Sequence, residues 1–235
     1  MTRFAAVAIV VCVVFVGGCA ATQQAKTVQP NGFLAPYKSL LQKGQRGQQA
    51  LLFYRNPKAD WADYHAILLQ PVTLWGQRNS DLSATQRKDL QELANSFYVT
   101  LYDKLSKDYT MVRSPGPGVM QIQIAISHGE PSHTALAFAS KVILPAKLAN
   151  SVWSFISGKP VFTGQVTIEA VVKDASTGEV LGVGADRRVG GLKLFEKNAF
   201  NSWGDVKNSL EFYAKAAVWR LCVLRGGTRC VKPKA

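Results

Sequence analysis

The feature that most restricts the fold of this chain is an alternation of polar and apolar residues on both sides of one turn. Every second side chain is apolar between residues 165 and 173, the sequence Asp-Ala-Ser-Thr-Gly follows at 174–178, and apolar residues return at 180–189. A period of two places one face of a strand on the core, and Asp, Ser and Gly favour turns. We therefore predict a half-buried hairpin, with a third alternating strand at 122–127.

Two further stretches have the period of an amphipathic helix. Residues 83–108 begin with Ser83 and Gln86 at the spacing of a capping box, and a final helix begins with Asp205 as its N-cap. Their apolar stripes are Leu90, Leu93, Ala94, Phe97, Leu101 and Leu105, and then Val206, Leu210, Tyr213, Ala217, Leu221 and Leu224. With a buried strand predicted at 64–72, this order indicates an α+β fold. We expect a mostly antiparallel sheet of about four strands, covered on one face by the two amphipathic helices.

The N-terminus indicates export and lipid attachment. An apolar run from 4 to 16 follows Arg3, and a helix of that length spans about 20 Å, less than the roughly 30 Å hydrocarbon core of a bilayer. Such a run is typical of a signal peptide rather than a transmembrane helix. It ends Val16-Gly17-Gly18-Cys19, which resembles a bacterial lipobox, whose cysteine receives a diacylglycerol and a further acyl chain. The alternative is an ordinary secretory signal that contains a cysteine by chance.

Several acyl chains on one residue anchor a protein stably. Residue 20 is alanine, whereas bacterial lipoproteins retained in the inner membrane commonly have aspartate there. The resemblance therefore implies the outer membrane of a Gram-negative cell, with the protein facing the periplasm. The expected organisation is a signal peptide at 1–18, a lipidated cysteine and flexible tether at 19–32, one α+β domain at 33–225 and a basic tail at 226–235.

The cysteines are distributed so that two remain in the mature domain. Cys12 would leave with the signal peptide and Cys19 would carry the lipid, which leaves Cys222 and Cys230 in an oxidising compartment. A Gly-Gly pair between them lets the chain turn, so we expect a disulfide. A redox or metal pair is the alternative, but neither a CxxC spacing nor a neighbouring histidine supports it.

The net charge of +13 is concentrated near the two ends of the mature chain. Residues 60–219 contain 16 basic and 15 acidic residues, whereas residues 20–59 and 220–235 contain basic residues and no acidic ones. The first group is a candidate for contact with an anionic surface beside the anchor; its members are Lys26, Lys38, Lys43, Arg46, Arg55 and Lys58. The alternative is that both ends are simply solvated. The compartment argues against nucleic-acid binding despite the charge.

The sequence contains no motif of a known catalytic site. A G-x-S-x-G elbow, an H-E-x-x-H helix, a P-loop and a cysteine cluster are all absent. The best metal candidate combines His128, Glu130 and His133, two imidazoles and a carboxylate that could hold zinc. Gly129 and Pro131 place these side chains on a turn, so we interpret the segment as a polar loop. No metal or cofactor is expected, and we expect a protein that is not an enzyme.

Two apolar features leave alternatives open. Residues 134–157 contain only two charges; they either pack over the open face of the sheet, which we favour, or form an oligomer or membrane contact. A set of aromatic residues either lines a glycan groove or consists of half-buried anchors; it comprises Trp61, Tyr64, Trp75, Trp153, Trp203 and Trp219.

Several short motifs in a fixed order resemble those of one family. They are Gly32-Phe33-Leu34 with Pro36-Tyr37, the stretch at 64–72, Pro115-Gly116-Pro117-Gly118, the stretch at 174–181, and Trp203-Gly204-Asp205-Val206. Behind a lipobox, they resemble an uncharacterised family of bacterial lipoproteins, the domain of unknown function numbered thirty-three thirteen, over about residues 32–225. The resemblance implies an α+β domain in the cell envelope. It brings no established reaction, so no catalytic residue is carried over.

These observations together predict an outer-membrane-anchored periplasmic lipoprotein. It would act as a non-enzymatic accessory or scaffold protein of the cell envelope, bound to the membrane through its N-terminal acyl chains and to an envelope protein partner. The alternative is a module that binds peptidoglycan or another envelope glycan.

Overall fold

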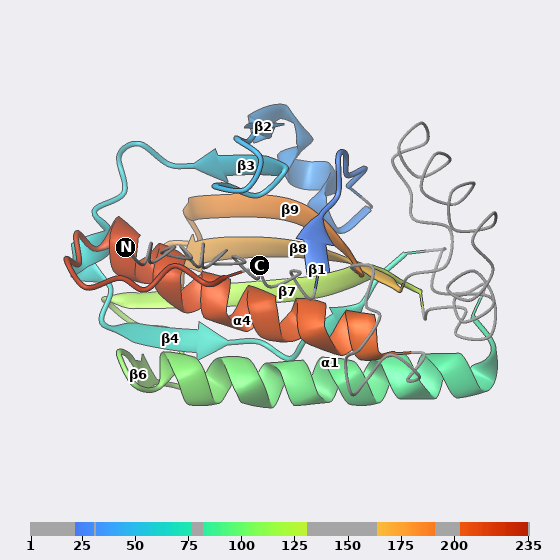
Figure 1. Ribbon diagram of the computed structural model, residues 1–235. Coiled ribbons are helices and arrows are strands. Elements are labelled where there is room, and N and C mark those ends of the chain that lie inside the picture. Colours follow the sequence, from blue (N-terminus) through green and yellow to red (C-terminus); the bar gives the residue numbers. More distant parts are fainter. Residues whose placement is uncertain (1–21, 31, 77–81, 131–163, 191–202, 235) are drawn as a thin grey trace, which may run out of the picture.

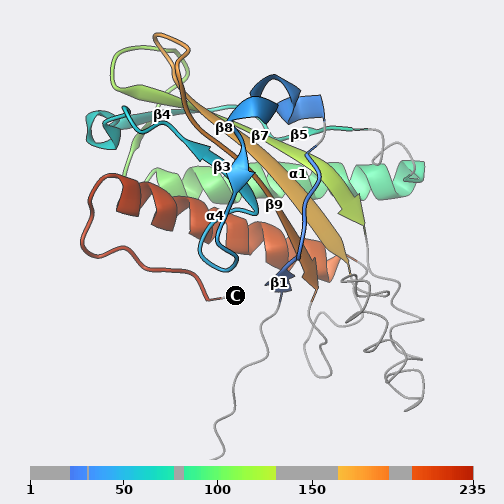
Figure 2. The same cartoon turned by 90° about the horizontal axis from the view of Figure 1, so that it is seen from above.

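The computed structural model describes residues 22–30, 32–76, 82–130, 164–190 and 203–234, apart from the side chain of Glu130. Its strands are β1 (Thr22–Gln24), β2 (Gln42–Lys43), β3 (Leu52–Arg55), β4 (Ala66–Leu69), β5 (Thr73–Leu74), β6 (Thr110–Met111), β7 (Val119–Glu130), β8 (Gln165–Asp174) and β9 (Val180–Gly190). Its helices are the 3₁₀ helices η1 (Gly32–Leu40) and η2 (Trp61–Asp63) and the α-helices α1 (Ala84–Leu105) and α4 (Gly204–Leu224). Both α-helices lie along the same face of the sheet (Figures 1 and 2).

Within the described part of the chain, the strands form one nine-stranded sheet in the order β2-β3-β9-β8-β7-β4-β6, with β1 beside β9 and β5 beside β7. The strands predicted at 122–127, 165–173 and 180–189 are confirmed within β7, β8 and β9, which form its antiparallel centre. The prediction of about four strands is wrong. The additional strands β1, β2, β3, β5 and β6 have only two to four residues each, too few to display an alternating pattern.

One side of the sheet is parallel, which the sequence analysis did not anticipate. β4 runs parallel to both β6 and β7, and β5 runs parallel to β7. A helix between neighbouring strands carries the chain back to the end where the first strand began, and the two strands are then parallel. Because α1 lies between β4 and β7 in the sequence, the predicted order strand, helix, strand already contained this crossover.

The two α-helices differ in how their first turns are held. Ser83 is the N-cap of α1 and forms the predicted capping box with Gln86, through hydrogen bonds of 3.2 and 3.0 Å. The cap predicted for the second helix is wrong, because Trp203 is the N-cap of α4 and makes no side-chain cap hydrogen bond. Asp205 lies in the first turn instead, where its Oδ2 accepts a hydrogen bond from the Gly164 N–H at 3.0 Å. A tertiary contact has replaced the local one.

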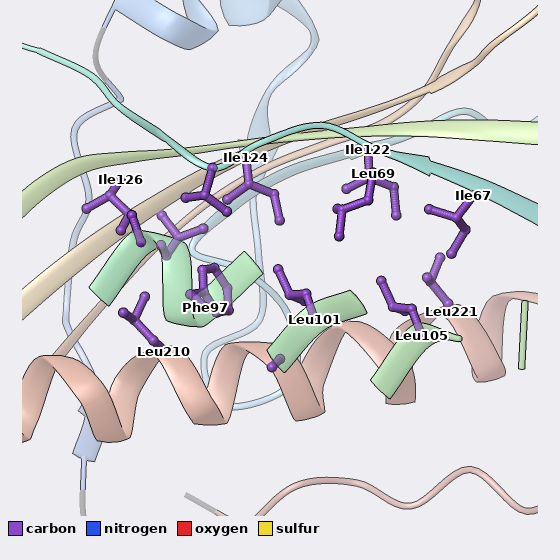
Figure 3. Close-up of a cluster of buried hydrophobic side chains, with 14 of the residues drawn as sticks. Ile67, Leu69, Phe97, Leu101, Leu105, Ile122, Ile124, Ile126, Leu210 and Leu221 are labelled. Carbon is purple, nitrogen blue, oxygen red and sulfur yellow. The ribbon is translucent and has the colours of Figure 1, made fainter. Parts of the chain in front are cut away.

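The main hydrophobic core lies between the sheet and the two α-helices. Its centre is drawn from three sources (Figure 3): Ile67, Leu69, Ile122, Ile124 and Ile126 of the sheet, Phe97, Leu101 and Leu105 of α1, and Leu210 and Leu221 of α4. The predicted stripes of both helices therefore face the sheet. Burial of such side chains stabilises the fold by roughly 1.5–3 kcal/mol each before the loss of conformational entropy is counted.

The other face of the sheet is covered over β8 and β9 by the N-terminal arm. Leu34 of η1 is buried against Val171, Val183 and Ala185. The Lys173 ammonium lies 5.5 Å from the centre of the Tyr37 ring. Residues 33–58 thus pack on the domain, and part of this arm joins the sheet as β2 and β3.

The flexible tether predicted at 19–32 is wrong for its described part. Residues Thr22–Gln24 form β1, which pairs antiparallel with Arg188–Gly190 of β9. The Ala25 N–H donates to the Arg187 carbonyl at 2.8 Å, and Ala25 is buried. A polar composition predicts a linker, but here backbone pairing and specific side-chain hydrogen bonds hold residues 22–25 on the domain. The described part of the domain therefore begins at residue 22 rather than at 33.

The turn between β8 and β9 is built around Asp174, as its sequence predicts. Asp174 Oδ1 accepts from the Ser176 hydroxyl at 2.7 Å and from the N–H groups of Ser176 and Thr177 at 2.8 Å. Asp174 Oδ2 accepts from the buried Tyr64 hydroxyl at 3.0 Å. Gly178 has a φ of 75°, a backbone angle that residues other than glycine rarely adopt.

These donors make the stability of the hairpin depend on pH. The Ser176 hydroxyl, aided by backbone N–H groups and by Tyr64, holds the pKa of the Asp174 carboxyl well below its ordinary value of 3.8. A carboxyl whose pKa is lower in the folded state stabilises the fold above the unfolded pKa, and this contribution is lost as pH falls below it. We therefore expect the stability advantage of the wild type over Asp174→Asn to shrink as pH falls below about 4. Urea midpoints measured between pH 6 and pH 3 test this, and an advantage independent of pH would contradict it.

The C-terminal tail is tied back to the last helix. Cys222 of α4 and Cys230 form the predicted disulfide, and the tail then runs beside α4 (Figure 2). The Lys232 ammonium lies 5.5 Å from the centre of the Trp219 ring. The disulfide and this contact thus hold the described residues of the basic tail, 226–234, against α4.

Candidate functional site

The six basic residues predicted to contact an anionic surface are all exposed, but they are spread along the sheet. Lys26 follows Ala25, which pairs with Arg187 near one end of β9. Arg55 lies opposite Gly182, near the other end of β9. At about 3.3 Å per residue, these two positions along β9 are roughly 15–20 Å apart. The described structure therefore does not gather them into one compact patch.

The predicted metal candidate is only partly within the described residues. His128 is 7% exposed and lies opposite Thr167 in the sheet. The Glu130 side chain and His133 lie outside the described residues. Among those that are described, no three His, Cys, Asp or Glu side chains are arranged to hold a metal ion.

Three of the aromatic residues considered for a glycan groove are buried in the main core instead. Trp61, Tyr64 and Trp203 are between 7 and 8% exposed and belong to the main core. Trp75 is 44% exposed and packs edge-on against Phe33, with ring centres 5.8 Å apart. Trp153 lies outside the described residues. The structure thus supports the interpretation of these described aromatics as anchors, with Trp75 as the exposed exception.

A buried polar cluster holds β1 against β9 and α4. We call it the Arg188 cluster; it consists of Thr22, Gln24, Asp186, Arg188 and Arg220. The Arg188 guanidinium donates from Nε to Thr22 Oγ1 at 2.9 Å and from Nη2 to the Thr22 carbonyl at 2.6 Å. The Gln24 amide donates to Asp186 Oδ1 at 2.6 Å and to the Gln49 carbonyl at 2.8 Å. Arg188 and Asp186 of β9 and Gln24 of β1 therefore join β1, β9 and the segment at Gln49.

The electrostatics of the Arg188 cluster follow from its burial. Asp186 and Arg188 are 6% and 3% exposed. Burial raises the pKa of the Asp186 carboxyl, while the Gln24 hydrogen bond and the charges of Arg220 and Arg188 act in the opposite direction. Burial likewise lowers the pKa of both guanidinium groups. Arg188 also lies 3.6 Å from the centre of the Phe212 ring of α4, a cation–π contact. The cluster sets one carboxylate against two guanidinium groups, so its charges are partly compensated, and its hydrogen bonds to Thr22 and Gln24 suit a structural clamp.

The sequence analysis did not identify the Arg188 cluster, although a signal was present. Asp186 and Arg188 are two residues apart in a predicted strand, so they share one face, while Arg187 between them lies on the other. That face is the one that β8 buries under the helices, since Val166 lies opposite Arg188. Charges on a buried face indicate a polar network.

A second group of buried polar residues lies on the opposite face of β7 and β8. His128, Thr167 and Glu169 are 7%, 4% and 0% exposed. Thr167 and Glu169 flank Ile168, which faces the helices, so they point to the other side of the sheet. A register shift between Ile126 and His128 places His128 opposite Thr167, on that same side. The polar side of strand 165–173, interpreted as exposed, is therefore partly buried.

An open groove lies between α1 and the parallel edge of the sheet. We call it the α1 groove; its volume is about 470 Å³, and its lining includes Leu68, Leu69, Tyr98, Val99, Tyr102 and Arg113. Val99 is 55% exposed and Tyr102 is 40% exposed. The edge strand β6 pairs only with Ala66 and Ile67 of β4, so the sheet edge at Leu68 borders the groove. Exposed apolar side chains beside a strand edge are typical of a surface that binds a protein segment.

Two predicted features lie outside the described residues. They are the lipidation site Cys19 and the apolar stretch at 134–157. Among the helices that the structure describes, none is both long enough and apolar enough to cross a membrane.

Solved structures with a similar arrangement are distant in sequence. A PelC dodecamer from Paraburkholderia phytofirmans is 12% identical, with 75% of this chain and 96% of that chain covered and a TM-score of 0.37. A dodecamer of a point variant of the same protein gives 10% identity, the same coverage and a TM-score of 0.36. A DUF4136 family protein from Bacteroides thetaiotaomicron is 12% identical, covering 68% of this chain and 92% of that chain with a TM-score of 0.30. Likenesses this distant carry no argument about the assembly or role of this chain.

No curated protein matches the chain. A family model matches residues 29–217, which include every described strand except β1, together with α1 and most of α4. The description of the matched family names no reaction. The chain belongs to the family described as protein of unknown function (DUF3313).

Proposed function

We propose that this protein is an outer-membrane lipoprotein that faces the periplasm and acts as a non-enzymatic accessory or scaffold of the cell envelope. The anchoring rests on Val16-Gly17-Gly18-Cys19, which follows directly on a short apolar run. The Cys222–Cys230 disulfide agrees with an oxidising compartment.

The accessory role rests on the α1 groove. Val99 and Tyr102 expose apolar surface, and covering such surface is favourable by roughly 25 cal/mol per Å². The occupant that fits is an extended segment of a protein partner, because β4 offers a strand edge beside these side chains. Asp103 and Arg113 at the groove add one charge of each sign for orienting that segment.

The anchoring is tested with Cys19→Ser in cells. The wild type should partition with the outer membrane and incorporate labelled palmitate, and the variant should do neither. A variant that still partitions and labels would contradict lipidation at Cys19.

The partner is tested by in-cell photo-crosslinking. A crosslinking amino acid in place of Tyr102 should give a specific heavier adduct, whereas the same residue in place of Lys215, exposed on α4 and outside the groove, should not. Failure to form an adduct at Tyr102, or equal adducts at both positions, would contradict a partner in the groove. Retention of the purified protein on murein sacculi at high salt would instead favour a glycan-binding module.

A further inference from the structure

The ends of the described elements define two ends of the sheet. The β1 end carries Thr22 at the start of β1, Gly190 at the end of β9 and Gly204 at the start of α4. The hairpin end carries the 174–180 turn and the Cys222–Cys230 disulfide. Both α-helices begin at the β1 end and run to the hairpin end (Figures 1 and 2).

Side-chain contacts confirm this division. At the β1 end, the Trp203 indole donates to Asp89 Oδ2 at 3.0 Å, which joins the starts of α4 and α1. At the hairpin end, the Arg225 guanidinium donates to the Asp108 carbonyl at 3.4 Å and lies 4.3 Å from the centre of the Tyr109 ring. The sheet and its two helices therefore have one common axis, with distinct ends.

The chain is held rigidly from its first described residue. Thr22 is 2% exposed and accepts two hydrogen bonds from Arg188. Gln24 is held on both sides, since its Oε1 accepts from the Gly47 N–H at 2.6 Å and its carbonyl accepts from Arg46 at 3.0 Å. These contacts and the pairing of β1 with β9 fix the chain on the domain from Thr22 onward.

We infer that β1 places the β1 end of the domain against the lipid surface and turns the hairpin end away from it. This rests on the proposed lipidation of Cys19, because only two residues separate Cys19 from Thr22. Three Cα–Cα steps of 3.8 Å span at most about 11 Å. The headgroup region of one leaflet is roughly 5–8 Å thick. The start of β1 then lies within or just above the headgroups, and the domain stands on the membrane instead of moving on a long tether.

This placement has consequences for the surfaces described above. Lys26 and Arg46 lie beside β1 and are within reach of anionic headgroups, where each contributes up to about 1 kcal/mol. Arg55 lies opposite Gly182 and Lys58 lies further along the chain, both toward the hairpin end and away from the lipid. Tyr102 of the α1 groove is near the last turn of α1, so the groove is open to the periplasm.

The inference is tested on the full-length lipidated protein in vesicles of phosphatidylethanolamine and phosphatidylglycerol. A fluorophore is attached to Lys88→Cys or to the matched Lys107→Cys; both lysines are exposed, and they mark opposite ends of α1 about 28 Å apart. A lipid with a nitroxide on its headgroup serves as the quencher. We expect quenching at position 88 to be severalfold stronger than at position 107.

A spacer variant provides the control. About twelve Gly and Ser residues inserted between Ala21 and Thr22 add a flexible reach of roughly 17–21 Å and leave the Arg188 cluster untouched. We expect vesicle binding to persist and the quenching difference to disappear. Equal quenching at positions 88 and 107 without the spacer would overturn the inference while lipidation stands. Loss of vesicle binding and of acyl labelling in the wild type would instead overturn the proposed anchoring, and the inference with it.

Discussion

An Arg188→Leu variant is expected to lose about 3–5 kcal/mol of its free energy of unfolding. Arg188 is 3% exposed and donates two hydrogen bonds to Thr22. Leucine would leave the Thr22 oxygens and the Asp186 carboxylate buried without this cation, and removal of one partner from a buried ionic network costs about 3–5 kcal/mol. Equilibrium unfolding in urea, with comparison of both midpoint and slope, measures the loss.

Arg46→Leu is the matched control for this prediction. Arg46 also donates to a carbonyl of β1, that of Gln24, but its side chain is exposed. Water can replace an exposed hydrogen bond, so we expect a change within about 0.5 kcal/mol. Similar losses in the two variants would show that burial of Arg188 contributes little. A further variant, Arg188→Lys, should lie between wild type and leucine, since it keeps the charge without the planar fork of donors.

A Leu101→Ala variant is expected to lose about 2–5 kcal/mol of its free energy of unfolding. Leu101 is 1% exposed and points from α1 into the main core, facing the sheet (Figure 3). Alanine removes apolar contacts and leaves a cavity, and both effects destabilise the folded state. The helix itself should tolerate alanine, because alanine has the highest helix propensity. Urea unfolding followed by circular dichroism gives the value.

Val99→Ala on the same helix is the control for the core prediction. Val99 is 55% exposed at the α1 groove, so we expect a change within about 0.5 kcal/mol. Leu101→Met, which nearly conserves volume, should lose less than about 1.5 kcal/mol. If Leu101→Ala and Val99→Ala gave the same loss, the position of the core between α1 and the sheet would be wrong.

The long elements of this fold were predictable because their signals are local. The capping box of Ser83 and Gln86 and the Asp174 turn depend on residues two or three positions apart. The strands β7, β8 and β9 are long enough to repeat a period of two several times. The disulfide was predictable because only two cysteines remain after the proposed signal and lipid sites are removed.

The elements that were missed depend on partners far along the chain. Residues 22–24 read Thr-Gln-Gln, a composition that predicts a linker, and they form a strand only because β9 supplies its backbone at positions 188–190. Asp205 has the residue type of an N-cap, but it binds the Gly164 N–H instead. The sequence does not indicate that β9 pairs with residues 22–24 or that Gly164 binds Asp205. No periodic pattern relates residues so far apart in the chain.

The candidate site shows the same division. Arg188 and Gln24 are 164 positions apart in the chain. Arg188 can donate to Thr22, and Gln24 to Asp186, only after β1 has paired with β9. The α1 groove likewise combines residues from α1, β4 and β6. The sequence by itself determined the amphipathic helices, the central hairpin, the disulfide and the expectation of a lipid anchor at Cys19, because each depends on neighbours in the chain. Only the tertiary structure decided that the chain is held from Thr22 onward, because hydrogen bonds between distant segments stabilise β1 where its own composition does not.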